Sequence, residues 1–369
     1  MRGRFGNHNR PSPWGCRLTA AAPLDCGEGS RQSVAMIRES TRHGPLGSLV
    51  VIGGMNLDIV GKSLAPFRPA DSNPGLVSTC PGGVGRNIAE NLARLDFAVE
   101  LVTVLGKDDR ASELEASCEA KGIGLAHAIR SRRAPTPVYL CLLGEDGRLT
   151  GAVAAMEAME ELLPSTLEER CGALDAASCI VVDANIPESS LAWIAERYKA
   201  RPRGGRPLLV LDPVSVAKAR KAKAHIGAFD LAKPNIAEAR ILAGGTDEDD
   251  PAILAAALRE RGLGAVHISL GPDGMYYEGF RHEGEKGLLV APSSLPERLE
   301  ARNVSGAGDA ACAALVWAAF KGFGARERSK AALAAALMTA SVGETVHPRL
   351  SPEILATTIS ELFPQSSST

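Results

Sequence analysis

A short stretch near the end of the chain combines residue types that can bind an anion and move a proton. Residues 303–315, NVSGAGDAACAAL, place Gly306, Ala307, Gly308 and Asp309 directly before an alanine-rich apolar run. Glycine is a poor helix former, so helix formation alone does not explain this choice. A helix N-terminus presents unpaired N–H groups and a positive dipole end, and small residues let an anion approach them. We therefore interpret Gly306, Ala307 and Gly308 as an anion hole.

Asp309 adds a carboxylate beside this anion hole. In phosphoryl transfer, a carboxylate so placed can accept the proton of the attacking hydroxyl while the amides stabilise the transferring group. An ordinary helix start, with Ser305 as N-cap and an acidic residue in the first turn, explains the same residues. Taken alone, the motif leaves both interpretations open.

Two stretches nearer the N-terminus offer groups for a hydroxylated ligand. In GGMNLDIV, Asn56 and Asp58 are two residues apart, so in extended chain both side chains point to one side. An amide and a carboxylate on one face suit the vicinal diol of a sugar, although a polar turn explains them equally well. In GGVGRN, the pair Gly82 and Gly83 suits a hinge or a close approach of substrate, and Asn87 follows one turn into a helix.

Two stretches in the second half suit a nucleotide and its metal. KPNIAEARIL places Asn235 and Glu238 on one face at a helix start, where their oxygens suit a hydrated Mg²⁺. A capping arrangement explains the same spacing. SLGPDGMYY is typical of strand, glycine turn and strand, and its Ser269, Gly271 and Gly274 either lie under a nucleotide or only form a hairpin.

The elements that must position these residues follow an alternating pattern. Apolar runs typical of strands alternate with helical patterns such as 85–96, and the runs occupy residues 47–54, 98–106, 178–185, 206–215 and 265–271. This alternation predicts an α/β fold with a mostly parallel sheet covered by helices on both faces. Such sheets bind ligands beyond the carboxyl ends of their strands. The segments 61–81 and 136–155 break the pattern and are interpreted as strands of a small β-lid on a single domain, 48–362, with a tail at 363–369.

Composition excludes several other classes. Of the 369 residues, 45% are hydrophobic and 23% charged, and the formal net charge is −2. This balance gives no electrostatic footprint for nucleic acid or a membrane surface. No apolar run reaches the ~18 residues of a membrane span. The eight cysteines contain no CxxC pair, which favours reduced thiols in a cytoplasmic compartment over a zinc site or a disulfide framework.

The first 47 residues differ from the rest of the chain. They carry seven arginines against three acidic residues, are rich in glycine, proline and serine, and show no apolar period. A disordered extension, or a gene start placed too early with Met36 as the true beginning, explains this composition. An Arg-rich, acid-poor leader is also typical of an organellar transit peptide.

The order and joint presence of these motifs resemble the ribokinase-like family of sugar and nucleoside kinases over residues 48–362. The signatures are PGGVGRNIAENLARL and the later NVSGAGDA. Within the family, PADSNPG (69–75), DPVS (212–215) and KPN (233–235) are similar to members that act on pseudouridine. The resemblance implies the ribokinase-like fold and ATP- and Mg²⁺-dependent phosphorylation of the 5′-hydroxyl of pseudouridine.

The resemblance also implies a role for each motif residue. Asp309 would be the catalytic base, and Gly306, Ala307 and Gly308 would hold the γ-phosphate. The ribose would be held by Asn56, Asp58, Gly82, Gly83 and Asn87. Asn235 and Glu238 would organise Mg²⁺ and the phosphates, mainly through water, and Ser269, Gly271 and Gly274 would line the ATP site. Asp71 and Asn73, in the lid segment, are expected to read the base.

Several alternatives stay open. The acceptor could be another sugar or nucleoside, such as ribose, fructose or adenosine, or the chain could be a non-catalytic nucleoside-binding protein. The uncharged Asn303 stands where the family often has an acid that helps bind a monovalent cation, so only weak dependence on K⁺ is expected. A homodimer through the lid, and a pathway neighbour that is a pseudouridine-5′-phosphate glycosidase, are the expected partners.

Overall fold

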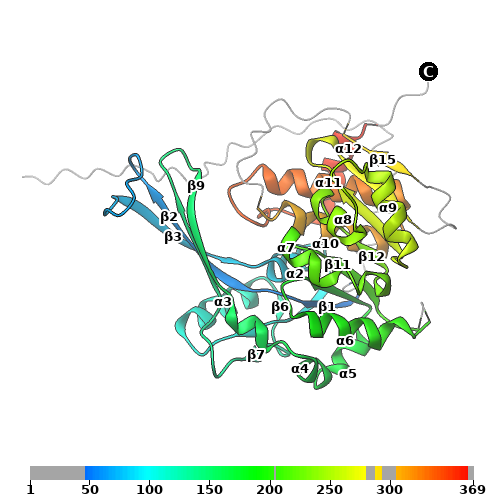
Figure 1. The fold of residues 1–369 in the computed structure, drawn as a ribbon, viewed down its shortest axis with the longest axis horizontal. Coiled ribbons are helices and arrows are strands. Elements are labelled where there is room, and N and C mark those ends of the chain that lie inside the picture. Colours follow the sequence, from blue (N-terminus) through cyan, green and yellow to red (C-terminus); the bar gives the residue numbers. More distant parts are fainter. Residues whose placement is uncertain (1–45, 203–204, 280–286, 293–304, 365–369) are drawn as a thin grey trace, which may run out of the picture.

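A large sheet divides the molecule into two layers of helices. The computed structural model describes residues 46–202, 205–279, 287–292 and 305–364. Figure 1 shows the helices packed around the sheet, with a slender second sheet projecting from one side. Residues 1–45 of the predicted extension at 1–47, and residues 365–369 of the predicted tail at 363–369, lie outside the described residues.

The main sheet has nine strands in the order β15-β14-β13-β12-β11-β10-β1-β4-β6. Every pairing is parallel except those that β14 makes with β13 and β15. The prediction of a mostly parallel sheet is therefore confirmed. In chain order the strands are β1 (Ser48–Ile52), β4 (Ala98–Val102), β6 (Ile123–Gly124), β10 (Cys179–Asp183), β11 (Leu208–Asp212), β12 (Leu231–Ala232), β13 (Ala265–Ser269), β14 (Met275–Glu278) and β15 (Leu288–Val290).

Alternate side chains of β1 enter two separate cores, which shows why its sequence is apolar throughout. Leu49 and Val51 lie in one core and Val50 and Ile52 in the other, all nearly inaccessible to solvent. The first core is covered by α2 (Val84–Arg94), α3 (Asp109–Ala120), α10 (Ala307–Phe320), α11 (Ala325–Ala340) and α12 (Pro352–Leu362). The second is covered by α4 (Pro164–Glu168), α5 (Cys171–Ala176), α6 (Glu188–Lys199), α7 (Val216–Ala222), α8 (Ile236–Ala243) and α9 (Pro251–Glu260). None of these described helices has the length and apolarity needed to cross a membrane.

The projecting sheet has four strands in the order β3-β2-β8-β9, which we call the lid. They are β2 (Asn56–Ser63), β3 (Gly75–Gly82), β8 (Val138–Leu143) and β9 (Leu149–Ala155). β2 pairs antiparallel with β3 and parallel with β8. A two-stranded ribbon, β5 (Val104–Leu105) with β7 (Ile129–Arg130), completes the strands. Because β2 follows β1 after three residues and β3 leads into α2, the lid is anchored at the carboxyl edge of the main sheet.

Candidate active site

Four buried ionisable groups gather at the carboxyl edge of the main sheet. Asp183 ends β10 and Asp212 ends β11, and the two are partners in the register of these neighbouring strands. Lys233 directly follows β12, and Asp309 lies in the first turn of α10. All four are at most 7% exposed. The parallel register brings three of these groups to one edge, and the start of α10 adds Asp309, which lies 126 positions after Asp183.

The start of α10 is shaped by a glycine that no other residue could replace without strain. Gly306 has φ 82°, in the left-handed region, and a Cβ added there would lie 1.9 Å from the carbonyl oxygen of Thr345. Ala310 N–H donates to the Gly306 carbonyl as the first bond of the helical ladder, at 2.9 Å. The preceding amides of Ala307, Gly308 and Asp309 therefore come before that ladder, as an anion hole requires.

Asp309 has the electrostatic setting of a base that titrates near neutrality. Burial and the neighbouring Asp212 raise the pKa of its carboxyl to about 7, and Asp183 acts in the same direction. A hydrogen bond from Asn87 Nδ2 to Asp309 Oδ2, 2.9 Å long, and the charge of Lys233 oppose this rise in pKa. A general base is most effective when its pKa lies close to the working pH.

Lys233 places a positive charge beside the predicted anion hole. Burial opposes that charge, but Asp212 holds the pKa of Lys233 above its usual value, and the two side chains lie 3.5 Å apart. A Cβ added at Gly308 would lie 3.3 Å from Lys233 Nζ, so the ammonium group borders the small residues of the helix start. Asp212 is itself fixed by the N–H of Val214, a β-branched residue held at φ 68°. This hydrogen bond holds one oxygen of the Asp212 carboxylate, and the other oxygen faces the lysine.

The glycines that open α2 are explained by the close crossing of two backbones. Gly83 has φ 98°, and a Cβ there would lie 2.5 Å from the Gly54 carbonyl oxygen. A Cβ at Gly85 would lie 2.8 Å from the Gly53 carbonyl carbon. This turn between β1 and β2 is held in place by Asp183, which accepts a hydrogen bond from Gly54 N–H at 2.8 Å. The predicted close approach at Gly83 is therefore made by the chain's own backbone.

Asn56 and Asp58 share one side of β2, as their spacing predicts. Asn56 Nδ2 donates to Asp58 Oδ1 at 2.5 Å, and Gly82 sits opposite, where a Cβ would lie 2.2 Å from Asp58 Oδ2. Burial raises the pKa of Asp58, against the effects of Asn56 and Arg86. The pair forms a polar floor at the base of the lid, on the same edge as Asp309.

Asn235 and Glu238 form a reciprocal capping box at the start of α8. Asn235 Oδ1 accepts from Glu238 N–H, and both Glu238 carboxylate oxygens accept from Asn235, each at 2.9 Å. No group of three or more acidic, histidine or cysteine ligands occurs within the described ranges, so they contain no all-protein metal cage. A buried carboxylate with spare lone pairs does fit a Mg²⁺ that keeps most of its waters and binds phosphate oxygens.

The predicted ATP-site residues lie next to this capping box. Ser269 ends β13 and forms an isolated parallel bridge with Asn235. Gly271 and Gly274 both have positive φ values, in the turn between β13 and β14, so the predicted strand–turn–strand is present. A Cβ at Gly274 would lie 2.2 Å from the Val290 carbonyl oxygen, so the local packing alone explains why this residue is glycine.

Asp71 and Asn73 are not brought to this edge. They lie in the loop at the far end of the β2–β3 hairpin, and the eight residues of β2 span roughly 25 Å. Asn73 is bonded to Arg68 N–H and to the carbonyls of Arg68 and Asp71, and Asp71 accepts from Ser72 N–H. Their hydrogen bonds build the loop itself. Asn303, on which the expectation of weak K⁺ dependence rests, lies outside the described residues.

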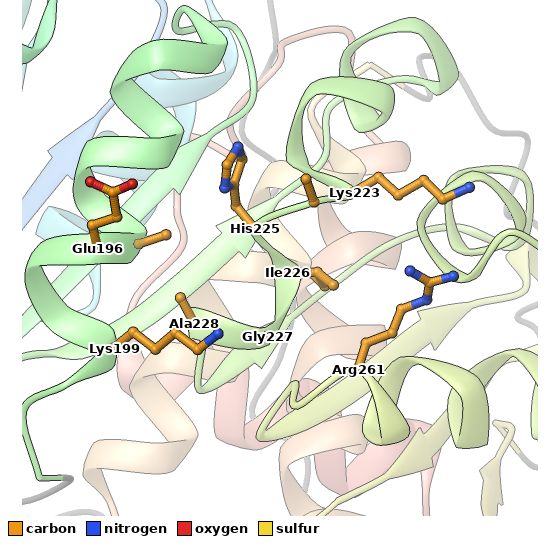
Figure 2. A pocket seen from close by; sticks show the side chains of 10 residues that line it. Glu196, Lys199, Lys223, His225, Ile226, Gly227, Ala228 and Arg261 are labelled. Carbon is orange, nitrogen blue, oxygen red and sulfur yellow. The ribbon is translucent and has the colours of Figure 1, made fainter.

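A cavity of about 280 Å³ lies at the opposite edge of the sheet. It is lined by Glu196 and Lys199 of α6, by Lys223 and His225, and by Arg261 at the end of α9 (Figure 2). These segments precede β11, β12 and β13, so the cavity faces the amino ends of the strands. Arg261 donates to the Ala243 carbonyl at the end of α8, at 2.9 Å, and thereby caps that helix. The cavity is separate from the cluster of Asp183, Asp212, Lys233 and Asp309.

Sequence reasoning assigned no role to Asp183, Asp212, Lys233, Arg86 or Thr345. Asp212 and Lys233 stand in the stretches DPVS and KPN, which carried the resemblance, but only the strand register places them beside Asp309. Thr345 comes from the loop after α11 and donates to Asn87 Oδ1 at 3.3 Å. A loop contact over 258 positions has no signal in local sequence.

Three kinds of comparison with known proteins give consistent results. The family model of the pfkB family carbohydrate kinases matches residues 47–351. The chain is similar to pseudouridine kinase of Escherichia coli K12, 33% identical over 305 residues that cover 82% of this chain and 93% of that protein. It is also similar to the uncharacterized sugar kinase YeiI of the same organism, 28% identical over 82% of this chain and 81% of that one. The fold matches Arabidopsis thaliana ribokinase complexed with ribose and ATP, with TM-score 0.70 and 22% identity over 86% of this chain and 99% of that one.

Proposed function

Because this chain belongs to the pfkB family of carbohydrate kinases, we propose that it transfers the γ-phosphoryl group of ATP to the 5′-hydroxyl of pseudouridine. The observation that carries the proposal is the place of Asp309. Its buried carboxylate lies in the first turn of α10, beside the small residues of the helix start and within hydrogen-bond reach of Asn87. This is where an acceptor hydroxyl would meet the terminal phosphate of a nucleotide.

In the proposed reaction, Asp309 takes the proton of the acceptor hydroxyl as its oxygen attacks the γ-phosphorus. The bond from the γ-phosphorus to the bridging oxygen breaks, and ADP leaves with that electron pair. The amides of Ala307, Gly308 and Asp309, together with Lys233, stabilise the negative charge on the transferring group. Mg²⁺ bound with the phosphates, near Asn235 and Glu238, would neutralise further charge.

The remaining proposed roles follow from position. Asn56 and Asp58, at the base of the lid, would bind the hydroxyls of the acceptor's sugar beside Gly82 and Gly83. Ser269 and the turn after β13 would line the nucleotide site, because they adjoin Asn235. We leave Asp71 and Asn73 out of the site within one chain, since the hairpin carries them away from it.

The choice of pseudouridine is supported by the similarity to the Escherichia coli enzyme over nearly its whole length. ADP release should therefore be measured with wild-type protein and equal concentrations of pseudouridine, uridine, adenosine, ribose and fructose. We expect pseudouridine to give the highest kcat/KM and uridine a much lower one. A higher kcat/KM for ribose or fructose would show that the acceptor is a sugar and not pseudouridine. If none of the five compounds gives ADP release, both the nucleoside and the sugar assignments are wrong.

A further inference from the structure

Arg86 is a buried cation to which the proposed reaction gives no task. It lies in the first turn of α2 and is 5% exposed. Its guanidinium pairs with Glu90, and its NH1 donates to Asn87 Oδ1 at 3.0 Å and to the Pro81 carbonyl at 3.3 Å. Glu90 is also bound by Arg94, 2.7 Å away. The ion pairs could be explained by helix stability, but the bond to Asn87 points toward the site.

The side-chain amide of Asn87 has only one orientation that satisfies its neighbours. Its Oδ1 accepts from Arg86 and from Thr345 Oγ1, while its Nδ2 donates to Asp309. Rotation of the amide by 180° would set Nδ2 against the donors of Arg86 and Oδ1 against the carboxylate. Arg86 and Thr345 thus select the rotamer in which Asn87 faces Asp309 as a donor.

We propose that Arg86 is a positioning residue, which locks the Asn87 amide so that its N–H₂ group is held on the carboxylate of Asp309. The catalytic meaning of this contact rests on the proposed function, whereas the contact itself does not. Asn87 donation favours the ionised carboxylate, the form that can accept a proton. When Arg86 is absent, the amide can rotate and this stabilisation is lost.

Other charges face Asp309 and must be held constant in a test. Asp183 from β10 and Asp212 from β11 disfavour its ionisation, Lys233 after β12 favours it, and Cys312 lies on the same helix. Arg86 also lowers the pKa of Asp58 through space. A direct effect of the Arg86 charge on Asp309 must therefore be separated from an effect that passes through Asn87.

The test is a carbon-13 NMR titration of the full chain labelled at the aspartate carboxyl carbon, with the Asp309 signal assigned by its loss in Asp309→Asn. No substrate is needed. In Arg86→Met, Glu90 keeps its pairing with Arg94, and we expect the Asp309 midpoint to rise by about one pH unit, the effect of one lost hydrogen bond to a charged group. The matched control Arg94→Met removes another cation that pairs with Glu90 and should leave the midpoint unchanged.

A double-mutant cycle separates the two explanations. In the Asn87→Leu background, Arg86→Met should add no further shift, because the path through the amide no longer exists. An equal shift in that background would assign the effect to charge alone and overturn the proposal, as would an unchanged midpoint in Arg86→Met. Thr345→Val, a milder change, should raise the midpoint by a smaller amount. If Arg86→Met does not fold, Thr345→Val decides, and an unchanged midpoint there refutes the proposal.

The outcome for Arg86 is distinct from the outcome for the proposed function. If the shift is seen but the wild-type protein phosphorylates no acceptor, Arg86 still positions Asn87 and the reaction assigned to the site is wrong. If the kinase reaction is present and the shift is not, the base stands and Arg86 serves only the stability of α2.

Discussion

At the scale of single residues, the protonation of Asp309 controls the proposed chemistry. Burial and Asp212 raise its folded pKa to about 7, far above the ordinary 3.8, so the carboxyl is protonated in mildly acidic solution. Only the ionised form can accept a proton. We therefore expect kcat/KM to fall tenfold for each pH unit below about 7 and to level off above it, in a profile measured at saturating MgATP. A flat profile between pH 5.5 and 8 would exclude Asp309 as the titrating base.

A second prediction concerns Glu238, whose two carboxylate oxygens both accept from Asn235. Glu238→Gln keeps an oxygen for the capping box but removes the charge that would attract hydrated Mg²⁺. We expect the Mg²⁺ concentration that gives half-maximal activity to rise several-fold, while the KM for the acceptor stays close to that of the wild type. The experiment is a Mg²⁺ titration at fixed ATP. If both quantities change together, Glu238 acts through the structure of α8.

Local sequence allowed single candidate residues to be predicted, but not the partners that surround them. Asp309 and Gly306 could be predicted as candidates, because the residues of a glycine-lined helix start are consecutive in the sequence. The neighbours that set the pKa of Asp309 could not, since Asp212 and Lys233 reach it only through strand register. The glycine pair for which a hinge was suggested has steric reasons instead: Gly83 lies where α2 crosses the β1–β2 turn, and Gly82 lies against the Asp58 carboxylate.

At the scale of elements, two glycines at the start of α10 serve different purposes. Gly306 needs its positive φ, and a Cβ there would clash with the Thr345 carbonyl. Gly308 is helical, and among the described residues a Cβ there would meet only Lys233 Nζ, at 3.3 Å. Gly306→Ala should cost roughly 1–3 kcal/mol of stability and lower the Tm. Gly308→Ala should fold with an equal or higher Tm, because alanine favours helix, but lose at least about tenfold in kcat as its methyl group fills the anion approach.

Differential scanning calorimetry and steady-state kinetics on the two alanine variants check this contrast. A Gly308→Ala protein with full activity would show that no anion approaches the amides at that point.

The alternation of β and α segments was enough to predict the elements and the mostly parallel sheet. The parallel pairing of β2 with β8 in the lid was not foreseen, because local pattern does not show which strands pair across a long connection.

At the scale of the whole molecule, the lid leaves an apolar face uncovered. Val77, Leu142 and Val153 lie on the face of this sheet opposite Asp58 and are 76%, 38% and 63% exposed. Contiguous exposed apolar groups of this kind are typical of a binding surface. We propose that a second copy of the chain covers them.

Val153→Lys should therefore convert a dimer into a monomer, measured by size-exclusion chromatography with light scattering at micromolar concentration. Leu289→Lys is the matched control, since Leu289 is 54% exposed on β15 of the main sheet, and it should leave the assembly unchanged. If the wild-type protein is a monomer in this measurement, the proposed dimer through the lid is wrong.

The most direct measurement is phosphorus-31 NMR of the product formed from ATP, Mg²⁺ and pseudouridine by the wild-type protein and by Asp309→Asn. We predict a phosphomonoester signal split into a triplet by the two protons on C5′, growing as ADP appears. Asp309→Asn should form the same product about 10²–10⁴ times more slowly, with its fold and ATP binding intact. Release of inorganic phosphate without this ester, or equal rates for the two proteins, would contradict the assignment of Asp309 as the base that activates the 5′-hydroxyl.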